Sequence, residues 1–341
     1  IEAGDDPSQR EIGEPLALRG DLALARGERP GEEWPRLILL CSDGTLSDSE
    51  GLLHYRVELT PGASAELVMK VPFLVLDGPE LEALRAKDFA SEHAEVRQFW
   101  RDRAREGCEI ETPEQDLNDF YRAHLTHMLI TNDREVGSHR IMTRVGSFSY
   151  GNFANESCMC ISDLDRRGYP EVAERCLESF LHYQGTVGLS GDFARQEGQF
   201  YGSGGYEHGQ YYVQHHGWVL WCLAQHYLYT RDADWLNRVG PKIVEGAEWI
   251  IAERQRTKLF GRDGRRVLEW GLLPAGGLED VGDWYHWLSN NAFNWWGLHW
   301  AGAVLAEAGH PQGPRLVAEA EAYWEDILAA FREASLRSPL V

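Results

Sequence analysis

The chain contains 341 residues, of which 43% are apolar and 26% are charged, and its formal net charge at pH 7 is −21. This length predicts roughly two domains, or one large domain with an appendage. The composition is typical of a chain with a buried core and excludes a disordered chain. The acidic balance disfavours a nucleic-acid partner, since phosphate backbones attract basic surfaces. The longest apolar runs, such as Leu37–Cys41, are too short to span a bilayer, so no membrane partner is expected.

The start of the chain and its cysteines bear on the compartment. The first residue is Ile1, and no basic stretch followed by an apolar stretch comes after it, so no signal peptide is expected, although a processed form or a fragment would look the same. Cys158 and Cys160 lack a second pair at zinc spacing. We therefore expect free thiols, no metal site and no cofactor, which fits a cytoplasmic location. The sequence does not indicate which oligomeric state the protein adopts.

Residues 1–75 have the patterns of β-strands. The segment Pro35–Cys41 is a short apolar run that ends at a turn signal, and both His54–Leu59 and Ala65–Val71 alternate apolar and polar residues. So few strands would form only part of a large β domain. We expect a β-sandwich-like remnant here.

Residues 76–113 predict a helical linker, because apolar residues recur at helical spacing from Glu80 to Glu106. Thr112 and Pro113 then predict the N-cap and first position of a helix. From residue 114 to 341 almost the whole chain has helical periodicity. The predicted helices cover 114–131, 152–167, 170–184, 210–230, 234–256, 289–308 and 311–335.

Three pairs of these helices are joined by similar short turns, at 164–170, 228–234 and 305–311. A repeated helical hairpin stacks side by side into a solenoid or a closed ring. Long Gly- and aromatic-rich loops at 132–151, 185–209 and 257–288 precede the helix that would be the inner one of each pair. Loops of this length usually carry function. The pattern predicts a mainly α fold with a cleft on one face of the ring.

Short motifs in this region resemble those of the six-hairpin glycosidases. The matching residues are Phe99-Trp100, Thr112-Pro113-Glu114, Leu117-Asn118, Tyr150-Gly151, Leu164–Tyr169, Gln184, His226–Asp232, Trp249-Ile250, Gly271–Pro274, Gly282–Trp284 and Gly297-Leu298. The resemblance implies an (α/α)6 toroid catalytic domain over 114–341, preceded by a β-sandwich and a helical linker. Since about seven helices are predicted, the toroid is expected to be incomplete, and a second catalytic carboxylate could lie in later helices. The implied function is hydrolysis of a glycosidic bond in an oligo- or polysaccharide.

Such hydrolysis needs two carboxyl groups that flank the scissile bond. The densest acidic cluster beside aromatic residues contains Glu279, Asp280 and Asp283, on a Gly-punctuated loop before a Trp-rich helix. Neighbouring aromatic rings raise the pKa of a carboxyl group, as a general acid requires. Asp280 and Asp283 are the first candidates and Glu279 the next, although each could instead cap the following helix.

The second carboxylate has two candidates, Glu207 and Glu156. Glu207 lies in a glycine-lined loop before one inner helix, and Glu156 lies at the start of another. Either could equally be a solvated surface residue.

Several aromatic and basic residues are candidates for binding the sugar. Trp284 and Trp287 precede the regular helix and could stack on a sugar ring, as could Tyr206. Trp296 and Trp300, at i,i+4 spacing, are expected in the core.

His215, His216 and Arg144 are further candidates for substrate binding. The adjacent histidines point to different helix faces, which argues against a shared metal. One could bind a sugar hydroxyl, and Arg144 could bind a substrate carboxylate. The same histidines with Tyr211 could instead supply the base of a polysaccharide lyase or a sugar epimerase. A non-catalytic glycan-binding toroid is the third possibility.

Overall fold

The computed structural model describes residues 17–26, 33–49, 52–72, 76, 78–135, 137–144, 146, 151–200, 212–279 and 281–338. The chain divides into two compact units, residues 1–102 and 103–341. No helix in the described ranges combines the length and the apolarity needed to cross a membrane.

The first unit contains an antiparallel sheet in the order β1-β2-β3-β6. Its strands are β1 (Ala17–Arg19), β2 (Leu22–Arg26), β3 (Glu33–Cys41) and β6 (Leu67–Lys70), and a separate hairpin joins β4 (Thr45–Ser49) to β5 (Leu52–Arg56). The three strands expected from the sequence correspond to β3, β5 and β6. One four-stranded sheet and one hairpin are described, so the β-sandwich stays a prediction.

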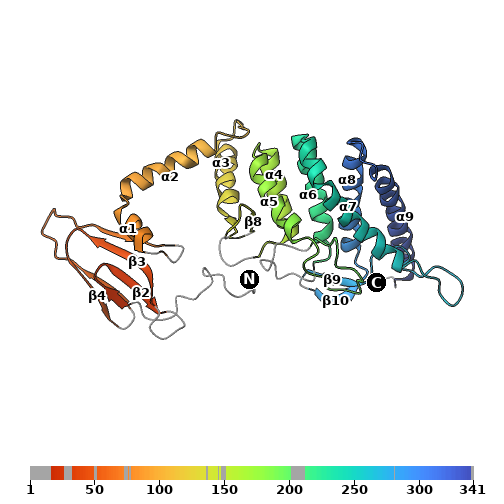
Figure 1. Ribbon diagram of the computed structural model, residues 1–341, viewed down its shortest axis with the longest axis horizontal. Coiled ribbons are helices and arrows are strands. Elements are labelled where there is room, and N and C mark those ends of the chain that lie inside the picture. Colours follow the sequence, from red (N-terminus) through yellow and green to blue (C-terminus); the bar gives the residue numbers. More distant parts are fainter. Residues whose placement is uncertain are drawn as a thin grey trace. The chain divides into compact units, whose positions relative to one another are not determined.

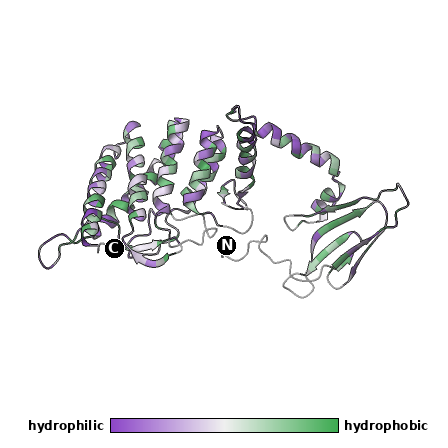
Figure 2. Cartoon of the chain, turned by 180° about the vertical axis from the view of Figure 1, so that it is seen from behind, coloured by the Kyte–Doolittle hydropathy of each residue, from purple (hydrophilic) through white to green (hydrophobic). Residues whose placement is uncertain are grey.

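Two helices follow the sheet, α1 (Gly78–Ala86) and α2 (Phe89–Arg103). The Lys70 ammonium at the end of β6 donates to the carbonyl oxygens of Leu84 (3.0 Å) and Arg85 (2.6 Å), at the C-terminus of α1. A cation at this end of a helix satisfies carbonyl groups that have no partner within the helix. By contrast, α2 has no buried residue, and Figure 2 shows many hydrophilic residues along it.

The second unit is mainly α. Its helices are α3 (Gln115–Ile130), α4 (Ala154–Arg166), α5 (Pro170–Tyr183), α6 (His215–Thr230), α7 (Ala233–Arg256), α8 (Leu288–Glu307) and α9 (Gly313–Arg337). Helix α6 packs against both α4 and α8, while α5, α7 and α9 pair with their preceding helices (Figure 1). The three predicted hairpins are therefore α4–α5, α6–α7 and α8–α9, with α4, α6 and α8 as the adjacent row.

The contact between α6 and α8 is unusually close at two glycines. A Cβ atom on Gly217 would lie 2.1 Å from the carbonyl oxygen of Phe293, and one on Gly297 would lie 2.4 Å from the carbonyl oxygen of Gly217. Only glycine lets the two backbones approach in this way. Both helices are apolar around most of their circumference, and Trp296 and Trp300 pack against the core as expected.

The sequence prediction was wrong in three local details. Helix α3 begins at Gln115 with Glu114 as its N-cap residue, and Thr112 bonds to Asn118 instead of capping it. Helix α6 begins at His215, later than expected, because residues 213–214 form a turn. Two of the long loops contain short hairpins, β7 (Asn132–Arg134) with β8 (Ile141–Thr143) and β9 (Gly276–Leu278) with β10 (Val281–Tyr285).

Candidate functional site

The loops before α6 and α8 meet at the N-terminal end of these helices. The backbones pair at Gly191 and Gly276, where the Asp192 amide donates to the Ala275 carbonyl oxygen (2.8 Å) and the Gly277 amide to that of Ser190 (3.1 Å). The short strands β8, β9 and β10 all lie at this end of the helices (Figure 1). The predicted clustering of the loops at one face therefore agrees with these contacts.

Glu279 forms the turn between β9 and β10, and Gln214 binds it. Glu279 has a φ of 45°, in the left-handed region that non-glycine residues seldom adopt. The Gln214 Nε2 donates to Glu279 Oε1 at 2.6 Å. Gln214 is only 2% exposed and directly precedes α6, so a buried amide holds an exposed carboxylate.

Glu156 is the second carboxylate at this end. It lies in the first turn of α4 and is exposed, yet its pKa is raised, mainly by partial desolvation and also by the negative charge of Glu279. This electrostatic interaction brings together two of the five predicted catalytic residues. They come from different loops.

Buried amides fix the backbone around this carboxylate pair. Asn290 donates its Nδ2 hydrogen to the carbonyl oxygen of Gly277 on β9 (2.9 Å), and Asn294 donates to that of Val213, beside Gln214 (3.1 Å). Both side chains are almost completely buried on α8. The first turns of α8 therefore hold the hairpin of Glu279 and the start of α6 in place.

A group of rings connects the residue before α4 with the start of α6. The ring of Phe153 lies 5.4 Å from that of Tyr212, which stacks on His215 at 4.6 Å. Burial lowers the pKa of His215 to about 3, so its imidazole is neutral at pH 7. His215 is fully buried in a stack of rings, away from solvent.

His216 has a structural environment. Its Nδ1 accepts a hydrogen bond from the Phe200 amide (2.9 Å), and its Nε2 donates to the Gly246 carbonyl oxygen (3.0 Å). The side chain is fully buried, and burial lowers its pKa to about 3. Both ring nitrogens are used by the backbone, which leaves none for the sugar hydroxyl that the sequence suggested.

The structure distributes the other predicted residues around the hairpin. Asp283 and Trp284 lie on β10 and are exposed, Trp284 to 46%. Trp287 occupies the N-cap position of α8 and is half-buried, with its ring 5.2 Å from that of Tyr285. Arg144 is buried and forms an ion pair with Asp133 (3.0 Å). Asp280, Glu207, Tyr206 and Tyr211 lie outside the described residues.

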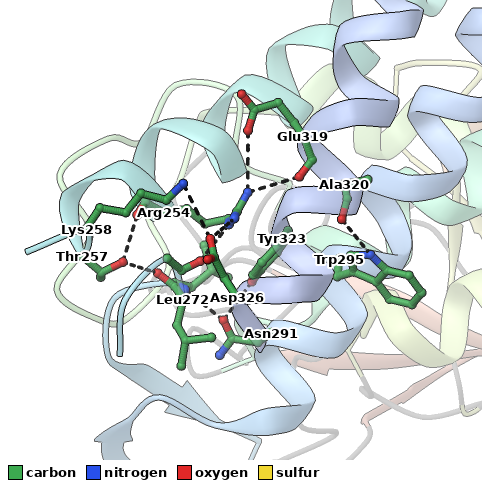
Figure 3. Close-up of polar contacts among 12 residues, drawn as sticks. Arg254, Thr257, Lys258, Leu272, Asn291, Trp295, Glu319, Ala320, Tyr323 and Asp326 are labelled. Atoms are coloured by element: carbon green, nitrogen blue, oxygen red, sulfur yellow. Dashed lines mark hydrogen bonds and ion pairs between the residues drawn. The ribbon is translucent and has the colours of Figure 1, made fainter. Parts of the chain in front are cut away.

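A buried ionic cluster anchors the segment that leads into β9 (Figure 3). The fully buried Arg254 donates to the Gly271 carbonyl oxygen and to Asp326 Oδ2, both at 2.8 Å, and its guanidinium lies over the ring of Tyr323. A Cβ atom on Gly271 would lie 2.1 Å from Asp326 Oδ2, so this position requires glycine.

Asn291 extends this anchor toward the hairpin. Its Oδ1 accepts hydrogen bonds from the Leu273 amide (2.9 Å) and the Tyr323 hydroxyl (2.8 Å). Residues 271–273 are thereby tied to α7, α8 and α9 before the chain enters β9.

Sequence reasoning assigned no role to Gln214 or Asn290. An amide side chain carries no charge and belongs to no recognisable sequence motif here. Its role depends on contacts between segments that are distant in the sequence. A polar residue at the start of an otherwise apolar helix was the one available signal, at Gln214 before α6 and at Asn290 early in α8.

No protein-family model, curated protein or solved structure matches this chain. Within the described residues there is no group of three or more His, Cys, Asp or Glu side chains that could hold a metal ion. The arrangement of carboxylates, amides and aromatic rings is thus the basis for any functional conclusion.

Proposed function

We propose that the chain is a glycoside hydrolase in which Glu156 is the general acid and Glu279 is the partner carboxylate. The interaction between these two residues carries the proposal. The carboxyl group with the raised pKa is the better proton donor near neutral pH. The other carboxylate would activate water or attack the anomeric carbon.

The surrounding groups support a saccharide as substrate. Trp284 and Tyr285 are exposed beside Glu279 on the same hairpin and offer flat apolar faces. Such faces suit the C–H side of a sugar ring. Arg144 is already paired with Asp133, so we favour a neutral sugar over a uronic acid.

We also propose that the helical hairpins are part of an (α/α) toroid and that the N-terminal strands derive from a β-sandwich. The alternation of the row α4, α6 and α8 with α5, α7 and α9 supports the first part. In such a ring the N-terminal ends of the inner helices would line one mouth, where Glu156 and Gln214 lie.

The proposal is tested with a panel of neutral aryl glycosides and the corresponding uronides. We expect the wild-type chain to hydrolyse a neutral member. Glu156→Gln should lower kcat/KM by about 10²–10⁴-fold on poor leaving groups and much less on good ones, because only a poor leaving group needs protonation. Glu279→Gln should impair both.

The matched control is Glu321→Gln, which changes an exposed glutamate on α9. It should leave kcat/KM unchanged. Absence of turnover across the panel, or equal activity of Glu156→Gln and Glu321→Gln, would contradict the proposal. Formation of an unsaturated product would show a lyase instead.

A further inference from the structure

The turn that carries Glu279 holds a feature that the carboxylate pair alone does not explain. Glu279 is one of two non-glycine residues with positive φ in the described ranges, and the other, Arg231, caps the end of α6. Strained backbone of this kind persists where neighbouring contacts enforce it, often at functional sites. Among the described residues, one such contact at Glu279 is the hydrogen bond from Gln214.

The orientation of the Gln214 amide is determined by chemistry. Its NH₂ group must face Glu279, because a carboxylate oxygen cannot donate and would repel the amide oxygen. Within the described structure the buried Gln214 Oε1 has no hydrogen-bond partner. The amide is therefore held by its donor, which points to the carboxylate.

A neutral donor suits a carboxylate that must keep its charge. A lysine or arginine at position 214 would cancel the negative charge that acts on Glu156. An amide orients the carboxylate by hydrogen bonding and leaves its charge in place.

We propose that Gln214 is a positioning residue that fixes the Glu279 carboxylate at the turn between β9 and β10. The inference rests on the proposed function for its catalytic meaning. Its physical content, the dependence of the position of the Glu279 carboxylate on one buried amide, stands separately.

The test compares Gln214→Met with Gln184→Met. Methionine keeps the length of glutamine and removes the donor. Gln184 is a matched control, because it is also buried and its Nε2 donates only to backbone carbonyls, those of Gly198 (3.0 Å) and Lys242 (2.9 Å). Both variants lose a buried amide, but only one loses a contact with a carboxylate.

We expect Gln214→Met to lower kcat about 10- to 100-fold and to leave KM nearly unchanged, since the Glu279 carboxylate loses the donor that positions it for the chemical step. Folded Gln184→Met should keep the wild-type kcat, whatever the substitution does to stability. An unchanged kcat in folded Gln214→Met, or an equal loss of kcat in both variants, would overturn the inference.

Two further measurements keep the test decisive. If Gln214→Met does not fold, Gln214→Glu keeps the shape of the side chain, and its carboxylate should repel Glu279 and lower kcat to a similar extent; an unchanged kcat counts against the inference. If the wild type cleaves no glycoside, the proposed function fails by itself. The side-chain carboxyl ¹³C resonance of Glu279, assigned with Glu279→Gln, is then compared in the wild type and in Gln214→Met at pH 7, and an identical chemical shift would refute the role of Gln214.

Discussion

The two ends of helices α4 and α6 place similar groups in opposite environments. At the N-terminal end, Glu156 of α4 is exposed, and its charged neighbour is the carboxylate of Glu279. Toward the C-terminal end, the Asp165 carboxylate of α4 is fully buried and contacts His226 Nδ1 of α6 at 2.9 Å. Burial raises the pKa of Asp165, and the hydrogen bond from His226 opposes this shift.

The difference shows how the environment assigns a role to a carboxyl group. Asp165 has a partner that can donate a hydrogen bond, and the ring of Trp235 covers His226 at 4.6 Å. Such a sealed pair joins two helices and is inaccessible to a substrate. Glu156 lacks this covering and interacts with a like charge, which favours proton transfer over stabilisation.

The largest expected effect is on catalysis, and it separates the role of Glu156 in activity from the role of Asp165 in stability. Glu156→Gln should lower kcat/KM by about 10²–10⁴-fold and leave the free energy of unfolding nearly unchanged. Asp165→Leu should leave kcat/KM nearly unchanged and destabilise the fold by about 1–3 kcal/mol, because the His226 N–H becomes unpaired in the core. Kinetics and urea unfolding of both variants check this. A loss of stability in Glu156→Gln would contradict the proposed difference between the environments of Glu156 and Asp165.

The sequence predicted the repeating part of this arrangement well. Apolar periodicity located the helix predicted at 234–256 within a residue of Ala233–Arg256, because that signal is local. The hairpin β9–β10 escaped prediction, since three- to five-residue strands in a glycine-rich loop leave no period to detect.

The pairing of site residues was beyond local reasoning for a physical reason. Glu156 and Glu279 were candidates by composition, but nothing in the sequence shows that their loops meet. The contact of Asp165 with His226 and that of Gln214 with Glu279 join residues 61 and 65 positions apart. Such contacts follow from helix packing, which for α6 and α8 depends on the close approach at Gly217 and Gly297.

The buried Arg254 cluster sharpens the comparison, because it is a buried ionic contact that includes neither Glu156 nor Glu279. Arg254→Met should cost about 3–5 kcal/mol, since Asp326 loses its closest cation and Gly271 loses a donor. The measurement is the midpoint and slope of urea unfolding. Adding Asp326→Asn should restore part of the loss. A cost below about 1 kcal/mol for Arg254→Met would mean that the cluster does not hold the segment before β9.

The most gradual expected effect is the pH dependence of stability that comes from His216. The pKa of this residue is lowered to about 3 from an ordinary value of 6.5, chiefly by burial. Between these two pH values His216 is protonated in the unfolded chain and neutral in the folded chain. Its contribution to stability is therefore fully present above about pH 6.5 and decreases as the pH falls toward 3. Protonation would also remove the acceptor for the Phe200 amide. From pH 7.5 to 4.5 this one group should account for about 2–3 kcal/mol.

The variant His216→Gln isolates this contribution, because glutamine offers an acceptor and a donor but does not titrate. Its unfolding free energy should fall less steeply with acid than that of the wild type, by about 1.4 kcal/mol per pH unit between pH 6 and 4. The buried His215, whose pKa is also lowered to about 3, is present in both proteins and so cancels in the comparison. Equal slopes in the two proteins would show that His216 is protonated in the folded state, and the two backbone hydrogen bonds that we assign to its neutral ring would then be wrong.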